Sequence, residues 1–134
     1  MSLFHSSDSK PPKTITNALG TFTLNKMLKV YTGRITSGLG VKMNLAFPEI
    51  NNGITDYQIN LFRQMDLNWT EFFEKLKEKK SEVDFENYYI NTVMIPDEKD
   101  TAYDVQAEIV LQKQDNVYSV ILKDFTITGI IEIE

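Results

Sequence analysis

The sequence predicts an α+β fold with a mainly antiparallel sheet, in the order strands, two consecutive helices, strands. Two changes of hydrophobic period indicate this order. Apolar residues alternate with polar ones up to residue 48, recur at helical spacing over 55–80, and alternate again from residue 88. Because strands joined by short turns lie on both sides of the helical insert, we expect the helices to pack on one face of the sheet.

The chain of 134 residues is the right size for one domain. Residues 1–17 are polar, rich in Ser, Lys and Pro, and have few periodic apolar positions, which predicts a flexible polar leader. The single α+β domain is expected at 18–134. Its first short strand enters at Leu19, with Phe22 and Leu24 on one face.

Two further strands are predicted before the helices. Residues 27–36 are rich in apolar and β-branched side chains, which favours a strand. The Ser-Gly-Leu-Gly segment at 37–40 supplies the glycines of a hairpin connection. The third strand has a clear alternation, with one apolar face formed by Val41, Met43, Leu45 and Phe47.

The helical segment divides into two predicted helices, at about 55–66 and 68–80. Thr55 and Gln58 have the spacing of a capping box, in which side chains and backbone at a helix start satisfy each other. Asn68 and Glu71 repeat that spacing at the second start. Each helix has one apolar stripe, Tyr57, Leu61, Phe62 and Met65 in the first and Trp69, Phe72, Phe73 and Leu76 in the second.

Strands return in the C-terminal part. We expect them at 89–95, 103–112, 117–123 and 125–133, with a charged loop at 97–100 and a turn at 113–116. The second of these alternates strictly between apolar and polar residues, which is typical of a strand with one solvated face.

The residue types that common mechanisms need are scarce. The chain has no Cys, which excludes thiol catalysis and Cys-bound metals, and its one imidazole, His5, lies in the predicted leader. Gly38-Leu39-Gly40 leads into a strand and lacks the third glycine of a dinucleotide-binding fingerprint. We therefore predict no catalytic residue, no cofactor and no metal site, and a chain that is not an enzyme.

The composition indicates where the protein is located and which classes of partner it lacks. No segment has the roughly 20 consecutive apolar residues that cross a bilayer. The first residues lack the apolar run of a secretory signal, so we expect a cytoplasmic protein with no membrane contact. Asn68-Trp69-Thr70 matches the glycosylation acceptor, but we interpret it as a helix cap. The net charge of −5 argues against nucleic acid as a partner.

The distribution of charge is the one anomaly. Residues 1–80 carry a net charge of +4 and residues 81–134 a net charge of −9. Such a concentration of acids can attract a protein with a basic surface. The competing interpretation is that folding interleaves the two halves and neutralises them. The candidate partner-binding residues are the acids of one segment, Glu82, Asp84, Glu86, Asp97, Glu98, Asp100 and Asp104.

Short motifs are spread along most of the chain: Met1-Ser2-Leu3-Phe4, Leu19-Gly20-Thr21-Phe22, Tyr31-Thr32-Gly33 and the helical run through Asn68-Trp69. In these motifs and their order the chain resembles a loose group of small bacterial domains of unknown function, some of them encoded among toxin-immunity genes. The resemblance implies a cytosolic α+β domain that could bind and block a toxin. It transfers no functional residue.

Three functional hypotheses result. The first is a non-enzymatic protein-binding module of the immunity-like kind. The alternative is a small-molecule binder, or a carboxylate-based hydrolase, with a pocket between the sheet and the helices. The third is a homodimer in which an edge strand at 125–133 pairs with its copy.

Overall fold

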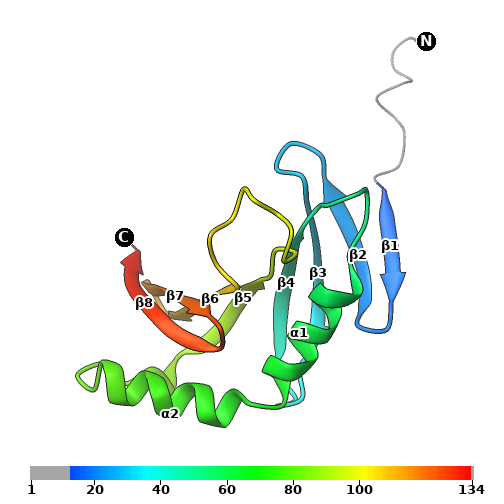
Figure 1. Ribbon diagram of the computed structural model, residues 1–134. Helices are drawn as coiled ribbons and strands as arrows, with labels where there is room; N and C mark the ends of the chain where they lie inside the picture. Colours follow the sequence, from blue (N-terminus) through cyan, green and yellow to red (C-terminus); the bar gives the residue numbers. More distant parts are fainter. Residues whose placement is uncertain (1–12, 134) are drawn as a thin grey trace.

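Residues 13–133 are described by the structure, a computed structural model, and they form one eight-stranded sheet with two α-helices (Figure 1). The strands lie side by side in the order of the sequence. They are β1 (Thr14–Asn17), β2 (Gly20–Asn25), β3 (Val30–Thr36), β4 (Lys42–Pro48), β5 (Tyr89–Met94), β6 (Ala107–Lys113), β7 (Asn116–Lys123) and β8 (Thr126–Ile133). Helices α1 (Asp56–Asp66) and α2 (Trp69–Lys79) lie between β4 and β5, and a short 3-10 turn, η2 (Phe85–Asn87), precedes β5.

The α+β class is confirmed, but the sheet is mixed rather than purely antiparallel. Six neighbouring pairs are antiparallel, whereas β4 and β5 run in the same direction, with Asn44 opposite Thr92 and Ala46 opposite Met94. A parallel pair needs a crossover connection of a dozen or more residues. The helical insert provides it, so the same segment that interrupts the strands also sets the direction of β5.

The first strands begin at positions other than those predicted. Strand β1 occupies Thr14–Asn17, inside the segment predicted as a leader, while residues 1–12, including His5, lie outside the described residues. Strand β3 begins at Val30 instead of residue 27. The reason is local, because the Asn25 side chain accepts a hydrogen bond from the Leu28 backbone N–H at 3.0 Å and closes a turn there.

Two other predicted strands begin later than expected. Met43, Leu45 and Phe47 are fully buried as predicted, but Val41 precedes β4 and is 48% exposed. Strand β6 starts at Ala107 instead of residue 103. Residues 101–102 form a turn, which the Tyr103 backbone N–H closes by donating to the Asp100 carbonyl, and residues 103–105 have no regular structure.

The helices begin and end close to the predicted bounds. Thr55 and Gln58 form the expected capping box, with reciprocal bonds at α1. At α2 the predicted box is absent, because the Asn68 side chain makes no cap bond. Its amide nitrogen instead donates to the Gln64 carbonyl at 2.7 Å, so the open end of α1 competes for the capping side chain.

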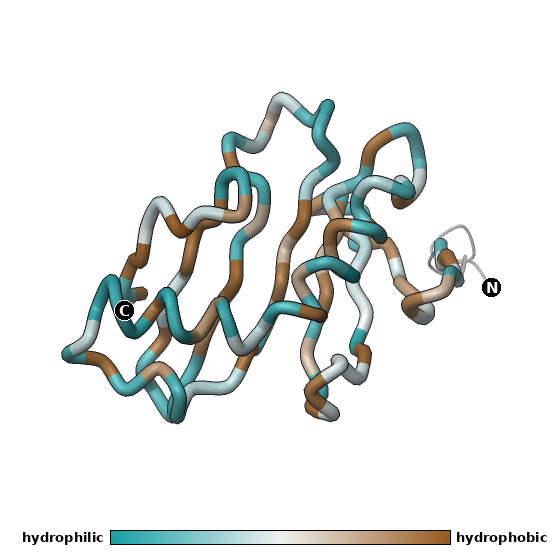
Figure 2. Tube along the Cα trace, turned by 60° about the horizontal axis from the view of Figure 1, so that its bottom comes forward, coloured by the Kyte–Doolittle hydropathy of each residue, from teal (hydrophilic) through white to brown (hydrophobic). Residues whose placement is uncertain are grey.

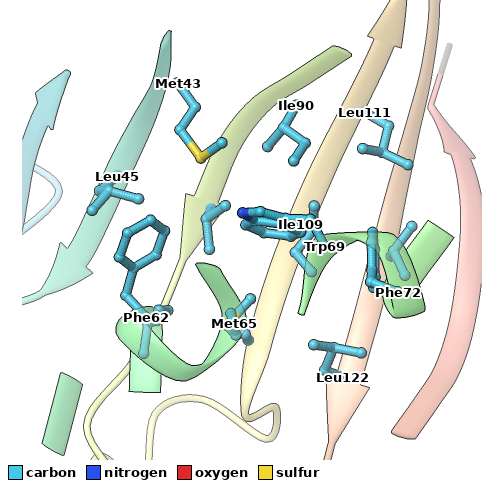
Figure 3. Packing of buried hydrophobic residues seen from close by; sticks show 14 of the residues in the cluster. Met43, Leu45, Phe62, Met65, Trp69, Phe72, Ile90, Ile109, Leu111 and Leu122 are labelled. Carbon is cyan, nitrogen blue, oxygen red and sulfur yellow. The ribbon is translucent and has the colours of Figure 1, made fainter. Parts of the chain in front are cut away.

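Buried side chains from both helices and from the strands form one hydrophobic cluster. Figure 3 shows Phe62 and Met65 from α1 and Trp69 and Phe72 from α2 beside strand residues such as Ile109. Figure 2 shows hydrophobic and hydrophilic residues alternating along the strands. We name the face of the sheet that contributes to this cluster the core face. Its members in β6 and β7 are Ala107, Ile109, Leu111, Tyr118, Val120 and Leu122.

Candidate functional site

The predicted acidic segment is divided by the structure into two groups. Glu82, Asp84 and Glu86 lie before β5, and the other four acids lie in the loop 95–106 after it (Figure 1). A strand of six residues spans roughly 20 Å, so the two groups are at opposite ends of β5. The segment is therefore not one continuous acidic patch.

Asp97, in the second group, has a structural role. Its side chain is buried, with Oδ1 accepting from the Thr55 hydroxyl at 2.6 Å and Oδ2 from the Lys99 backbone N–H at 3.0 Å. The neighbouring Gln58 is fully buried and donates to the carbonyls of Pro48 and Ile95 at 3.2 and 2.9 Å. Together these side chains join the start of α1 to the ends of the parallel strands.

Three of the other acids are paired with lysines at the surface: Asp84 with Lys113 at 2.7 Å, Asp104 with Lys123 at 3.2 Å, and Glu82 with Lys80 at 3.3 Å. The hydrogen bond from Lys113 lowers the pKa of Asp84, and the bond in return raises the pKa of Lys113. Glu86, Glu98 and Asp100 make no ion pair with another residue of 13–133.

A groove of about 560 Å³ lies between α2, the hairpin that joins β3 to β4, and the start of β5. We name it the hairpin groove. Its apolar lining comes from three segments, the hairpin with Leu39 and Val41, the helix with Phe73, and β5 with Tyr89. Leu39, Val41 and Tyr89 are each about half exposed, at 51%, 48% and 54%. The charged residues of its rim are Lys42, Glu74, Lys77 and Glu86.

Asp66, the last residue of α1, fixes one wall of this groove. Its Oδ2 accepts from the Gly38 backbone N–H at 2.8 Å, and its Oδ1 accepts from the Trp69 indole nitrogen at 2.8 Å. A Cβ at position 38 would lie 3.2 Å from Asp66 Oδ2, a tight contact that favours glycine at the tip of the hairpin. One carboxylate thus ties the hairpin to the base of α2.

Sequence reasoning missed the hairpin groove. It assigned Val41 to a buried strand face and did not consider Tyr89 as a surface residue, because exposure depends on which segments meet in space. A usable signal was Leu39. An apolar side chain between two glycines in a turn has no place in a strand pattern, and such a residue is informative when others gather around it.

A smaller pocket of about 180 Å³ lies where α1 meets α2, against the C-terminal strands. We name it the junction pocket. Its walls are mainly apolar, and the ion pair between Glu71 and Lys75 at 3.0 Å lies on its rim. Its buried lining residues are Met65, Trp69, Phe72, Ile109, Leu122 and Ile127, several of which are seen in Figure 3.

Neither concavity is lined by a buried carboxylate. Over residues 13–133 the one buried carboxylate is Asp97, which is occupied by Thr55 as described. Glu108 accepts a short hydrogen bond from the buried Ser119 hydroxyl on the face of the sheet opposite the core face. Burial, with Glu98 and Asp97 nearby, raises the pKa of Tyr57 at the start of α1. No group of three potential ligands within the described range could hold a metal ion.

No protein-family model, no curated protein and no solved structure matches the chain. Neither helix in the described part of the chain has the length and apolar character to span a bilayer.

Proposed function

We propose that the chain is a non-enzymatic protein-binding module whose contact surface is the hairpin groove. The observation that carries this proposal is that Leu39, Val41 and Tyr89, all about half exposed, line one concavity. Large apolar side chains scattered singly over a surface are ordinary, whereas a group of them inside a polar rim is typical of an interface. The partner inserts apolar or aromatic side chains between the hairpin and α2.

The charge of the rim narrows the kind of partner. Lys42 and Lys77 provide positive charge and Glu74 and Glu86 negative charge around the same groove. A segment with apolar anchors flanked by charges of both signs complements this arrangement better than a uniformly basic one. Of the seven acids predicted as contacts, Glu86 is the one that lines the groove.

The acidic loop 95–106 is proposed as a second contact, for a basic region of the partner. Support comes from the unpaired acids Glu98 and Asp100 within the described chain, and from loop length, since a 12-residue connection between two hydrogen-bonded strands is longer than usual. The resemblance to domains encoded among toxin-immunity genes makes a bacterial toxin the first partner class to test. The proposal also places both helices on the core face of the sheet. The hydrophobic cluster that the helices share with the strands supports this placement.

A displayed library of random peptides, selected on the immobilised protein, tests the groove. We expect the selected peptides to contain closely spaced apolar or aromatic residues and to lose binding to Val41→Glu. The matched control is Met27→Glu, which places the same charge at a 91% exposed apolar position in the β2–β3 turn. Peptides that bind Val41→Glu as well as the parent protein would contradict the proposal.

The acidic contact is tested on a partner that binds the groove. Glu98→Lys combined with Asp100→Lys is expected to weaken affinity and to reduce its dependence on salt, because fewer opposite charges meet. Asp97 is left unchanged, since its buried carboxylate is bonded to Thr55 and its reversal would disturb the fold. Unchanged affinity and salt dependence would remove the loop from the interface.

A second candidate function, binding of a small apolar molecule, is favoured by the junction pocket. An apolar cavity of about 150 Å³ can take up benzene, and this pocket is of similar size. Because the one carboxylate of its lining, Glu71, is paired on the rim, we propose binding rather than hydrolysis. Trp69 is the single Trp and lines the pocket, so benzene should change its fluorescence saturably in the parent protein and not in Leu122→Phe, which fills the space. A linear response in both would refute this candidate.

A further inference from the structure

We propose that two copies of the chain join their sheets edge to edge through antiparallel pairing of β8 with β8, with Ile131 opposite its own copy. The inference is independent of the hairpin groove, which lies against α2 and the β3–β4 hairpin. It specifies one interface, one register and one partner, a second copy of this chain.

The outer edge of β8 has the properties of a pairing edge. Strand β8 is the last of the sheet and has a neighbour on one side only within the described chain. It is eight residues long, twice the length of the other edge strand, β1. It contains neither Lys, Arg nor Pro, the residues with which exposed edges are commonly protected from pairing. Its one charge is Glu132.

The face of β8 opposite the core face selects the register. Ile131 and Ile133 lie on this face, opposite Ser119 and Val117, and are 54% and 43% exposed. Gly129 is on the same face, and a Cβ there would have only Ile121 as a neighbour, at 3.7 Å. With Ile131 on the two-fold axis, the Ile133 side chain of the second copy lies over Gly129 and fills the space that the glycine leaves.

The core face supplies charge complementarity in the same register. Glu132 of the second copy then lies opposite Ile130, and both are on the core face, as their partners Tyr118 and Val120 are. Ile130 borders a groove of about 380 Å³ that also contains Lys79 and Lys80 from the end of α2. Lys79 makes no ion pair with another described residue. The two-fold symmetry repeats this contact, so each copy offers one acid and receives one.

Cysteine cross-linking tests the register directly, because the chain has no Cys of its own. Residues opposite each other in an antiparallel pair have Cα atoms about 4.5–5.5 Å apart, within the range of a disulfide. Ile131→Cys should therefore oxidise to a covalent dimer about tenfold faster than Met27→Cys, whose thiol meets its copy by random collision. In Ile133→Cys the two thiols are separated by roughly 13 Å along the strands, and the rate should match that of Met27→Cys.

Two results would overturn the proposal. Equal rates in the three variants would mean that β8 does not pair, and a fast Ile133→Cys with a slow Ile131→Cys would mean that the register is wrong. Sedimentation equilibrium of the parent chain gives a second measurement. We expect the mass to rise from 15.5 kDa toward twice that value with concentration. Glu132→Lys should abolish the rise, and Glu132→Lys with Lys79→Glu should restore it; a monomer at every concentration would refute the pairing.

Discussion

Removal of the Asp66 side chain tests the structural basis of the hairpin groove. In Asp66→Ala two donors lose their acceptor. One is the indole N–H of Trp69, a residue that is 2% exposed, and the other is the Gly38 backbone N–H at the hairpin tip. A buried donor left without a partner costs about 1–3 kcal/mol, and a typical hydrogen bond, such as that of the Gly38 N–H near the surface, contributes about 1 kcal/mol. We expect a loss of about 2–4 kcal/mol in the free energy of unfolding.

The assay uses Trp69 as a unique reporter, since the chain has one Trp. Urea unfolding followed by tryptophan fluorescence gives the change in stability, and the indole N–H resonance in an NMR spectrum reports whether its hydrogen bond is present. Asp66→Asn is the matched variant. It retains one side-chain oxygen, so it should lose about half as much stability.

Loss of the tie should also free the hairpin. Exchange of the Gly38 backbone amide with solvent is expected to accelerate in Asp66→Ala, and peptides selected on the hairpin groove should bind more weakly because one wall is no longer fixed. A loss below about 0.5 kcal/mol together with an unchanged indole resonance would refute the reasoning, since each lost bond alone is expected to cost more.

Three further predictions follow from single contacts. Gln58→Leu removes the bonds to two strand-end carbonyls in the core and should cost roughly 2–5 kcal/mol in urea unfolding, against almost nothing for an equivalent change at an exposed helix position. Gly33→Ala would place a Cβ 2.5 Å from the Thr21 carbonyl oxygen, so its thermal midpoint should fall by several degrees, and an unchanged midpoint would exclude this close approach. Because Lys113 lowers the pKa of Asp84, that pair stabilises the fold above the usual value of 3.8 and ceases to do so as pH falls through the lowered one. The stability difference between Asp84→Asn and the parent should therefore vanish in acid, and a difference that persists at low pH would assign the effect to something other than charge.

Features that depend on neighbouring residues were predictable from sequence. The capping box of Thr55 and Gln58 is formed as expected, because both partners are within one turn. The alternation of Met43, Leu45 and Phe47 likewise placed all three in the core. The capping prediction at Asn68 is wrong because a nearby carbonyl of the preceding helix offered its side chain another partner.

Features that depend on distant segments were not predictable. The pattern of residues 42–48 and 89–94 does not indicate that these two strands run parallel. The direction of β5 depends on where the helical insert leads the chain back to the sheet. The hairpin groove is assembled from segments some 50 residues apart, so its side chains could not be grouped beforehand. The acidic segment was visible as composition, but β5 carries its two ends apart.

The parallel contact between β4 and β5 has a consequence for how the chain folds. In the other six pairings no helix lies between the two strands, and most of the connecting loops are short. The pairing of Asn44 with Thr92 closes a loop of roughly 50 residues, at a higher cost in chain entropy. We expect β1–β4 and β5–β8 to form early as two separate meanders and this seam to form last. The slowest step of folding is then the docking of two halves, and the seam is where the native sheet opens first.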